Sequence, residues 1–341
     1  MSSAPLLLGA ILALPFIAAV IVSRVVWPLR TTRILPNRER VVIIGATSGI
    51  GLEVARLYAG RHAHVVVVGR RIGLLKEVAR QLEPYASSIH PVAGDVTLPE
   101  DVRRITIESL QALKGGIDTL IICAGGISVL PFSELAGTDT AGTGAGAAAA
   151  TTSSLDSSDA IMKLLPGDAQ AALDASVRIM NVNYHAPLNL TSHFLPALTQ
   201  TSIAGNIMVV SSMAGKIGAP TRSIYAASKH AAQGFFESLS MEVERTGVHI
   251  GIVSPGTVDT DLRLSAMDLP KSKADDLKER VASGTKKGAM TAWACAEGIV
   301  RGSDLQQREV VMPWFYRVSL VLDLVSPWLV RWLAQKKYGY L

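Results

Sequence analysis

Tyr225 and Lys229 lie four residues apart within 224–245, a stretch with helical periodicity. Side chains at this spacing share one face of a helix. A phenol with a pKa of about 10 is a poor acid–base catalyst at neutral pH, and a neighbouring lysine cation favours its phenolate form. Ser212 ends a predicted strand, where its hydroxyl can hold a substrate oxygen beside the phenol. Because Tyr and Lys often occur at this spacing by chance, their meaning depends on the elements around them.

A glycine-rich loop follows the first predicted strand and opens a helix. It consists of Gly45, Ala46, Thr47, Ser48, Gly49, Ile50 and Gly51. Glycines permit a tight turn and a close backbone approach to a pyrophosphate, and the helix N-terminus offers free N–H donors and a positive dipole end. Such a loop alone indicates only a turn. Its position between a first strand and a helix predicts a dinucleotide-binding site.

The second predicted strand ends at Arg70 and Arg71. An acidic residue here would bind the ribose hydroxyls of NAD, whereas an arginine attracts the 2′-phosphate of NADP. We therefore expect NADP(H), with Arg70 at the 2′-phosphate and Ser48 adding a hydrogen bond to it. Asp95 and Val96, after the third strand, are placed to meet the adenine.

Short runs of β-branched residues alternate with helical stretches from residue 41 onward. The predicted strands are Val41–Gly45, His64–Val68, Ile89–Ala93, Asp118–Cys123, Asn206–Ser211, Val248–Val253 and Glu309–Met312, with helices notably at Gly49–Arg61, Ile224–Arg245 and Met290–Gly302. This order predicts right-handed crossovers and a parallel sheet covered on both faces. The fold class is therefore α/β, a doubly wound parallel sheet (Rossmann fold), whose ligands bind at the carboxyl ends of the strands.

Residues 4–23 carry no charged side chain. As a helix they would span the apolar core of a bilayer, about 30 Å thick, so we expect an N-terminal transmembrane helix. A cleaved signal peptide and a buried helix are the alternatives, but no basic region precedes the apolar run. Arg24, Arg30, Arg33, Arg38 and Arg40 all follow it, which places the C-terminal side in the cytosol. A glycosylation sequon at 189–191 hints at the opposite orientation, but it lies within a helical pattern.

The C-terminal segment 313–341 is also apolar, but Arg317, Asp323 and Arg331 interrupt it and Pro327 divides it. It is too charged to span a membrane. Two interpretations remain open: an interfacial amphipathic pair of helices, or final helices packed on the core.

The chain has 341 residues, of which 18% are charged, with a net charge of +5. This composition excludes a mainly disordered chain, and two cysteines cannot form a disulfide framework. We expect a membrane anchor and basic linker at 1–37, one domain at 38–312 and an apolar helical tail at 313–341. A Gly/Ala/Ser/Thr-rich insertion at 134–160 has too little apolar bulk to order itself. The mild charge gives no reason to expect a nucleic-acid partner.

Together these motifs resemble the short-chain dehydrogenase/reductase family over about residues 38–312. The resemblance implies that Tyr225 donates or accepts the proton, that Ser212 orients the carbonyl, and that Lys229 binds the nicotinamide ribose and lowers the pKa of Tyr225. Asn183 matches the fourth catalytic residue, which holds a water in a proton relay. Asn181 is the neighbouring alternative.

The resemblance also implies further cofactor contacts. Ala124 and Gly125 belong to a motif in which Cys123 replaces the usual asparagine, a brace of the sheet near the cofactor. The remaining contacts are Pro255, Gly256, Val258 and Thr260, which resemble a P-G-x-V-x-T stretch that holds the carboxamide and the phosphates. No metal site is expected.

The stretch from Tyr225 to Leu262 is similar to a membrane-anchored subgroup, the 11β-hydroxysteroid dehydrogenases and DHRS-type reductases. This likeness implies an NADP(H)-dependent oxidoreductase that transfers a hydride between the nicotinamide and a hydrophobic ketone, aldehyde or alcohol, steroid-, retinoid- or lipid-like. It implies a single-pass protein of the endoplasmic reticulum membrane with a cytosolic catalytic domain, in contact with membrane lipid and able to form a homodimer. The alternatives are a 3-ketosphinganine-type lipid reductase and a non-catalytic, membrane-anchored cofactor-binding protein.

The segment Asp261–Thr285 is expected to close over the substrate. Leu262, Leu264, Met267 and Leu269 would give it an apolar inner face, although ordinary loop packing explains the same pattern.

Overall fold

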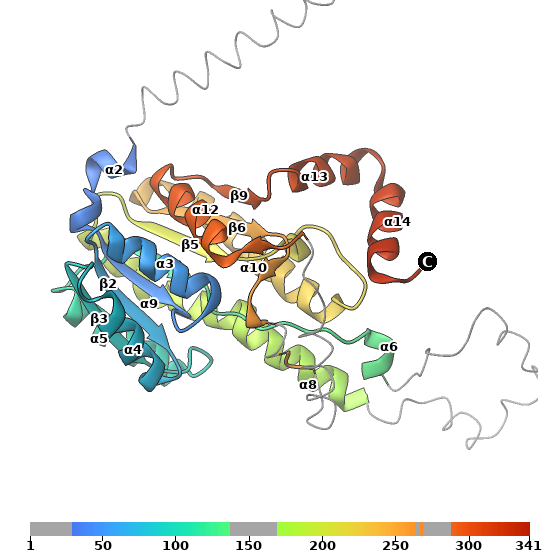
Figure 1. Ribbon diagram of the computed structural model, residues 1–341, viewed down its shortest axis with the longest axis horizontal. Helices are drawn as coiled ribbons and strands as arrows, with labels where there is room; N and C mark the ends of the chain where they lie inside the picture. The colour runs from blue at the N-terminus through green and yellow to red at the C-terminus, as the bar shows by residue number, and fades with distance from the viewer. Residues whose placement is uncertain (1–28, 137–168, 263–265, 269–287) are drawn as a thin grey trace, which may run out of the picture.

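A seven-stranded parallel sheet forms the centre of the computed structural model, which describes residues 29–136, 169–262, 266–268 and 288–341 (Figure 1). The strand order is β3-β2-β1-β4-β5-β6-β9. The strands are β1 (Arg40–Ile44), β2 (His64–Gly69), β3 (Ser88–Ala93), β4 (Thr119–Ile122), β5 (Asn206–Val210), β6 (His249–Pro255) and β9 (Glu309–Met312). The chain reverses direction across the sheet between β1 and β4, so this is where a doubly wound sheet forms its ligand crevice.

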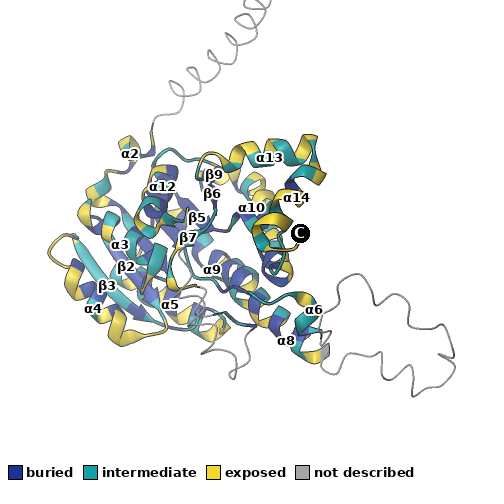
Figure 2. Ribbon diagram, turned by 45° about the vertical axis from the view of Figure 1, so that its right-hand side comes forward, coloured by how far each residue is buried: buried dark blue, intermediate teal, exposed yellow. Residues whose placement is uncertain are grey.

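Helices cover both faces of the sheet. One face packs against α3 (Gly49–Gly60), α4 (Ile72–Leu82) and α12 (Ala292–Asp304), and the other against α5 (Pro99–Ala112), α9 (Ala186–Thr201) and α10 (Ser223–Glu242). Strand β1 shows why: Val41 and Ile43 join the first core, Val42 and Ile44 join the second, and all four are fully buried. Figure 2 shows the same arrangement for the helices, whose exposed residues lie on their outer faces. The predicted α/β doubly wound fold is confirmed.

The remaining elements are short or lie at the ends of the chain. They are α2 (Arg30–Arg33), α6 (Phe132–Leu135), α8 (Ala169–Met180), a π-helical turn at Asn181–His185, 3-10 turns at Pro36–Arg38, Met213–Gly215 and Glu244–Thr246, the paired strands β7 (Val258–Asp259) and β8 (Met290–Thr291), α13 (Tyr316–Val325) and α14 (Pro327–Tyr338).

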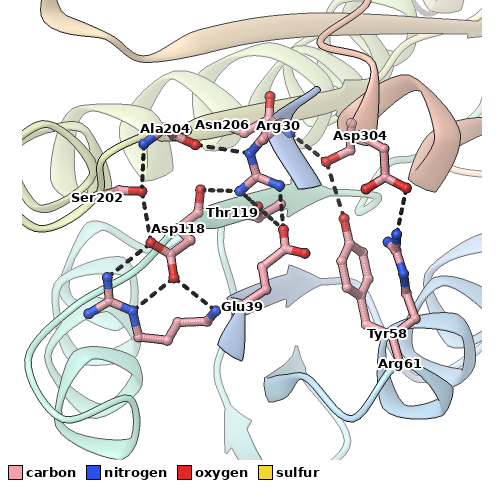
Figure 3. Close-up of polar contacts among 12 residues, drawn as sticks. Arg30, Glu39, Tyr58, Arg61, Asp118, Thr119, Ser202, Ala204, Asn206 and Asp304 are labelled. Carbon is pink, nitrogen blue, oxygen red and sulfur yellow. Dashed lines mark hydrogen bonds and ion pairs between the residues drawn. The ribbon is translucent and has the colours of Figure 1, made fainter. Parts of the chain in front are cut away.

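A buried arginine secures the start of the described chain to the amino-terminal edge of the sheet (Figure 3). Arg30 is 1% exposed, and its guanidinium pairs with Glu39 at 2.6 Å. It also donates to the hydroxyl of Thr119 at 2.6 Å and to the carbonyl of Ala204 at 2.9 Å. Because Arg30 is consumed by these contacts, it contributes no solvent-exposed charge to the predicted basic linker.

Arg40 forms a second internal ion pair beside it. Its guanidinium makes two hydrogen bonds with the carboxylate of Asp118, at 2.9 and 3.0 Å. The hydrogen bond with Asp118 is also the main cause that raises the pKa of Arg40. Two of the five arginines that suggested a cytosolic flank are therefore partly or wholly structural.

Residues 1–28 lie outside the described part of the chain, so the predicted transmembrane helix stays a prediction. Within the residues that are described, no helix combines the length and the apolarity needed to cross a bilayer. Most of the predicted insertion, 137–160, also falls outside the described residues, while Glu134 and Leu135 belong to α6.

The C-terminal tail forms two helices, α13 and α14, beyond the carboxyl end of β9 (Figure 1). One face is turned toward the domain, where Val330 is 8% exposed. The other face is apolar and open, with Leu324 at 86% and Trp328 at 70% exposure. Packing on the domain is thus observed for one side of the tail, and contact of the other side with a membrane stays a prediction.

Candidate active site

A cavity of about 350 Å³ opens at the carboxyl edge of the sheet. Its volume is within the range of sites for small molecules. Ser212, Tyr225 and Lys229 line it together with residues of the predicted cofactor site: Ile50, Gly125, Pro255, Gly256, Val258 and Thr260. The fold therefore brings the predicted acid–base residues and one end of the predicted cofactor site to the same wall.

Tyr225 lies in the first turn of α10 and is 7% exposed. Its backbone N–H donates to the hydroxyl of Ser128, itself buried, at 3.2 Å. Burial raises the pKa of the Tyr225 phenol, while a hydrogen bond with Ser212 and the positive charge of Arg222 oppose that rise. Lys229 is not among the groups that shift this pKa here, and the predicted lowering by Lys229 stays a prediction.

Lys229 is buried beneath the tyrosine, with 5% exposure. Its ammonium donates to the carbonyl of Val210 at 3.0 Å and lies 5.9 Å from the ring centroid of Tyr225. Burial lowers the pKa of Lys229 to about 8. The amine is therefore able to change protonation state close to neutral pH.

Asn183 sits in the π-helical turn between α8 and α9 and is 1% exposed. Its amide oxygen accepts from the N–H of Gly126 at 2.8 Å, and its amide nitrogen donates to the carbonyl of Gly126 at 3.0 Å. The same nitrogen donates to the hydroxyl of Ser228 at 2.9 Å. Asn181 is exposed on the same turn. Asn183 is thus the asparagine that faces the site, and it ties the loop after β4 to α10.

The glycine-rich loop has the close backbone approaches that its sequence predicts. A Cβ on Gly51 would lie 2.2 Å from the carbonyl oxygen of Gly45, so no side chain fits there. Gly45 and Gly49 adopt positive φ angles of 87° and 55°. Ser48 is exposed at the N-cap of α3, and Gly49 faces the methyl group of Thr260. The loop leaves a bare backbone cradle before a helix N-terminus, which fits a dinucleotide pyrophosphate.

The two arginines after β2 have different contacts. Arg71 donates to the hydroxyl of Thr47 in the glycine loop at 3.2 Å. Arg70 is 71% exposed, and its guanidinium lies 4.0 Å from the carboxylate of Asp95. Asp95 also accepts from the hydroxyl of Thr97 at 2.8 Å. Neither arginine is among the described residues that line the cavity, and the sequence singled out only Arg70 as a contact to the phosphate. Val96, the predicted neighbour of the adenine, is 9% exposed and packs in the core.

The motif after β4 lies between the loop and the lysine. The backbone of Ala124 lies against Gly45, so that a Cβ on Gly45 would be only 2.8 Å from the Ala124 nitrogen. A Cβ on Gly125 would lie 3.1 Å from the amide oxygen of Asn183. Burial raises the pKa of the Cys123 thiol, which suits an inert side chain and not a nucleophile.

The C-terminal tail supplies the opposite wall of the cavity, which sequence reasoning missed. Its lining residues include Tyr316, Leu322, Val330, Leu333 and Tyr338. Tyr316 covers Gly256 so tightly that a Cβ on that glycine would lie 2.2 Å from its ring. The predicted strand order indicates only that the segment after β9 begins at the edge of the sheet that carries the site, and it does not indicate which way the tail then turns.

Of the segment Asp261–Thr285, which was predicted to close over the substrate, only a few described residues lie at or near the cavity wall. Leu262 lines the cavity, and the backbone N–H of Met267 donates to the carbonyl of Ile127 at 2.9 Å. Met267 packs against a small cluster of apolar residues that includes Ile179. Leu264 and Leu269 lie outside the described residues.

The arrangement can polarise and protonate a carbonyl oxygen. Ser212 and Tyr225 are hydrogen-bonded neighbours at the cavity wall, so both hydroxyls can bind the same substrate oxygen. The glycine-rich loop lies at the same edge of the sheet as these two hydroxyls. Pro255 and Gly256 line the same cavity and would hold the nicotinamide, which would supply the hydride.

Comparison with known proteins gives relatives along most of the chain. The chain is 34% identical over 244 residues to dehydrogenase/reductase SDR family member 7B of Bos taurus, which covers 72% of this chain and 65% of that protein. It is 28% identical over 304 residues to hydroxysteroid 11-beta-dehydrogenase 1-like protein B of Xenopus laevis, covering 88% of this chain and 87% of that one. The chain therefore spans less than two thirds of the length of the first relative.

Solved structures share the fold at lower identity. An alcohol dehydrogenase from Thermococcus sibiricus, complexed with 5-hydroxy-NADP, superposes with a TM-score of 0.59 at 21% identity and covers 81% of this chain and 96% of its own. A short chain dehydrogenase from Burkholderia cenocepacia, in complex with NADP, gives a TM-score of 0.60 at 20% identity, covering 85% and 95%. The sequence profile of the short chain dehydrogenases matches residues 39–152 and 160–268. With its glycine cradle and its serine, tyrosine and lysine at one cavity, this chain belongs to the short-chain dehydrogenase/reductase family.

Proposed function

We propose that the chain is an NADP(H)-dependent oxidoreductase that transfers a hydride between the nicotinamide and a hydrophobic ketone, aldehyde or alcohol. One observation carries this proposal: Ser212, Tyr225 and Lys229 meet residues of the cofactor cradle at one cavity, and apolar residues of the tail complete its wall. Membership of the family supports hydride transfer as the reaction. The apolar residues of the cavity wall support a hydrophobic substrate.

The residues of this chain have separable tasks in the reductive direction. Ser212 and Tyr225 bind the carbonyl oxygen and orient the carbon. The cofactor, when bound, supplies the hydride. As charge develops on the oxygen, Tyr225 delivers its phenolic proton there and becomes a phenolate, which the nearby Lys229 cation stabilises. Asn183 fixes the loop after β4 against α10, so that the lysine and the tyrosine keep their positions. In the oxidative direction the same proton returns to Tyr225.

Preference for NADP(H) is supported by Arg70 and Arg71. Arg71 is hydrogen-bonded to the glycine loop through Thr47, and the guanidinium of Arg70 lies 4.0 Å from the carboxylate of Asp95, after β3. A 2′-phosphate beside them would receive charge-assisted hydrogen bonds, which are roughly twice as strong as neutral ones. The cofactor complexes of the two solved relatives agree with this assignment.

The membrane setting is a second part of the proposal. The predicted anchor precedes α2, and the exposed face of the tail carries Trp314, Leu324 and Trp328 at 70–86% exposure. Large exposed apolar surfaces of this kind favour an interfacial position. We propose a single-pass protein of the endoplasmic reticulum with a cytosolic domain that draws its substrate from membrane lipid. Carbonate extraction and protease protection in microsomes test this: the full chain should stay in the membrane, with its domain digested from the cytosolic side.

A homodimer is proposed on family likeness. The helices that carry Asn183 and Tyr225 form the dimer contact in many members. Light scattering of the purified chain in detergent tests the oligomeric state.

Turnover is tested with the full chain in detergent, a panel of steroid, retinoid and long-chain ketones, and NADPH or NADH. We expect NADPH oxidation with at least one hydrophobic ketone and its loss in Tyr225→Phe. Tyr85→Phe is the matched control, because Tyr85 is 58% exposed and lies outside the cavity. Near-wild-type reduction by Tyr225→Phe would overturn this mechanism. NADPH binding without reduction of any ketone would favour the non-catalytic alternative, and activity confined to 3-ketosphinganine would favour the sphingoid reductase.

A further inference from the structure

A buried carboxylate, that of Asp268, is bound to the main chain of the loop after β4. Asp268 is 4% exposed, and its Oδ2 accepts from the backbone N–H groups of Val129 and Leu130, each at 2.7 Å. Its Oδ1 is buried and has no hydrogen-bond partner among the described residues. Because burial of a carboxylate is costly unless hydrogen bonds compensate it, these two charge-assisted bonds hold the side chain and the loop firmly together.

The preceding residue, Met267, contacts the same loop in two further ways. Its backbone N–H donates to the carbonyl of Ile127 at 2.9 Å. Its side chain lies over Gly126, where an added Cβ would be 2.7 Å from both its Sδ and its Cε. Met267 and Leu130 also pack in one apolar cluster with Ile224 of α10. The loop after β4 is therefore held on one side by Met267 and its neighbour, and on the other by α10.

The loop held in this way carries part of the active site. Ile127 lines the cavity, and the Oγ of the buried Ser128 accepts from the backbone N–H of Tyr225 at 3.2 Å. The carbonyl of Ser128 accepts from Arg222, at the start of the same helix, at 2.8 Å. A shift of this loop would therefore move one wall of the cavity and the backbone of the tyrosine together.

We propose that Asp268 is a positioning residue for the substrate: by holding the main chain of Val129 and Leu130, it sets the cavity wall at Ile127 and the place of the Tyr225 phenol relative to the substrate carbonyl. This inference rests on the proposed function. Asp268 is not among the described residues that line the cavity, so it acts through the loop. Its partners also lie outside the glycine-rich loop, so its removal should affect the ketone and not the affinity for NADPH.

Two substitutions separate the acceptor from its charge. Asp268→Ala removes the acceptor, whereas Asp268→Asn keeps an amide oxygen that can accept the same two N–H groups. The assay uses the full chain in detergent, saturating NADPH, and the steroid, retinoid or long-chain ketone of the panel that wild type reduces fastest. We expect Asp268→Ala to raise KM for the ketone and to lower kcat/KM about tenfold or more, as for lost hydrogen bonds to a charged group. Asp268→Asn should show a smaller rise in the same KM, because neutral hydrogen bonds are weaker.

A purely structural role of Asp268 would give a different result. Loss of folded protein lowers kcat and the stoichiometry of NADPH binding together, and it leaves KM for the ketone unchanged. We expect the stoichiometry and the Kd for NADPH, from fluorescence titration, to match wild type in both variants. The matched controls are Asp174→Ala and Asp174→Asn, because Asp174 is exposed on α8, where it accepts from Gln170 at 2.7 Å. Both should behave as wild type.

The inference is overturned if Asp268→Ala has the wild-type KM for the ketone, or if its kcat falls only in proportion to the NADPH stoichiometry. If Asp268→Ala does not fold, Asp268→Asn carries the test. A raised KM with the NADPH stoichiometry intact then supports the inference, and an unchanged KM overturns it.

Two measurements do not need turnover. Hydrogen exchange at the amides of Val129 and Leu130 should be faster in Asp268→Ala than in Asp174→Ala. In the NADP-saturated Tyr225→Phe background, Asp268→Ala should also weaken binding of the same ketones about tenfold by titration calorimetry. Equal exchange and equal affinity in the two variants overturn the inference. Absence of ketone reduction by wild type, with both of these differences present, would count against the proposed function alone.

Discussion

The ammonium of Lys229 lies 5.9 Å from the ring centroid of Tyr225, and both side chains are buried in the same cavity wall. The two pKa values respond oppositely to that burial. The pKa of Tyr225 is raised, and the pKa of Lys229 is lowered to about 8. In both groups burial disfavours the charged form. The site of the protein alone is thus destabilised by a lysine that it needs for chemistry, and this cost is measurable.

Lys229→Met should change how stability depends on pH. Below pH 8 the amine is protonated in the folded and the unfolded chain, so the cost of burying its charge is fully present. Between about pH 8 and 10.5 the folded chain releases the proton first, the unfolded chain binds more protons, and stability rises by about 3 kcal/mol. Lys229→Met lacks this rise and should be more stable than wild type at pH 7. Urea unfolding from pH 6.5 to 10.5 measures both slopes.

The matched control for that series is Lys76→Met, because Lys76 is exposed on α4. It should reproduce the wild-type slope. Parallel curves for wild type and Lys229→Met across the whole pH range would contradict the lowered pKa.

Arg70 and Arg71 should determine the choice between NADPH and NADH. Each charge-assisted hydrogen bond to a 2′-phosphate is worth about 1.5–3 kcal/mol, so each single alanine variant should lower kcat/KM for NADPH by about tenfold or more. NADH lacks that phosphate, and its kcat/KM should not fall. Arg80→Ala is the control, since Arg80 is exposed and pairs with Glu77 on α4. An unchanged NADPH-to-NADH ratio in the double variant would show that another group reads the phosphate.

The sheet and the cofactor loop were predictable because their signals are local. Runs such as Val41–Ile44 are apolar at every position, as strands buried on both faces must be, and all seven predicted strands occur. The loop from Gly45 to Gly51 was identifiable because glycine is required wherever a Cβ would meet backbone, as at Gly51. A constraint of this kind restricts the residue type at the position where it acts, so it can be recognised in the sequence.

The tail wall and the buried arginine were not predicted, because their partners are distant in sequence. Tyr338 meets Arg222, and Arg30 meets Thr119 and Ala204. An arginine beside an apolar segment has the same sequence pattern whether it faces lipid headgroups or pairs with a buried Glu39. Only the path of the chain decides between these, and tertiary contacts of this kind carry no periodic signal.

Gly51→Ala should reduce cofactor binding and stability together. The added Cβ would lie 2.2 Å from the Gly45 carbonyl oxygen, so the loop must open, at a cost of about 1–3 kcal/mol. The displaced cradle should weaken NADPH binding by more than about tenfold, measured by fluorescence titration. Gly60→Ala on the same helix is the control: a Cβ there meets nothing within 4 Å. That variant should bind NADPH as wild type does, and equal losses in both variants would refute the role of the cradle.

Arg30 and Glu39 should behave as a coupled buried pair. Arg30→Met removes the cation from a site where Glu39 is only 2% exposed, and it leaves the hydroxyl of Thr119 and the carbonyl of Ala204 with one donor fewer. Removing one partner of a buried ion pair costs about 3–5 kcal/mol, because the remaining charge stays buried. Urea unfolding should show this loss for Arg30→Met, and a smaller one for Arg30→Met combined with Glu39→Met, because no charge then remains. Arg38→Met, at an exposed position, should unfold as wild type. Arg30→Met and Glu39→Met each lower the free energy of unfolding by some amount when made singly. If the double variant loses the sum of these two amounts, the side chains are not coupled. Arg30 would then act only through its hydrogen bonds to β4 and to the chain before β5.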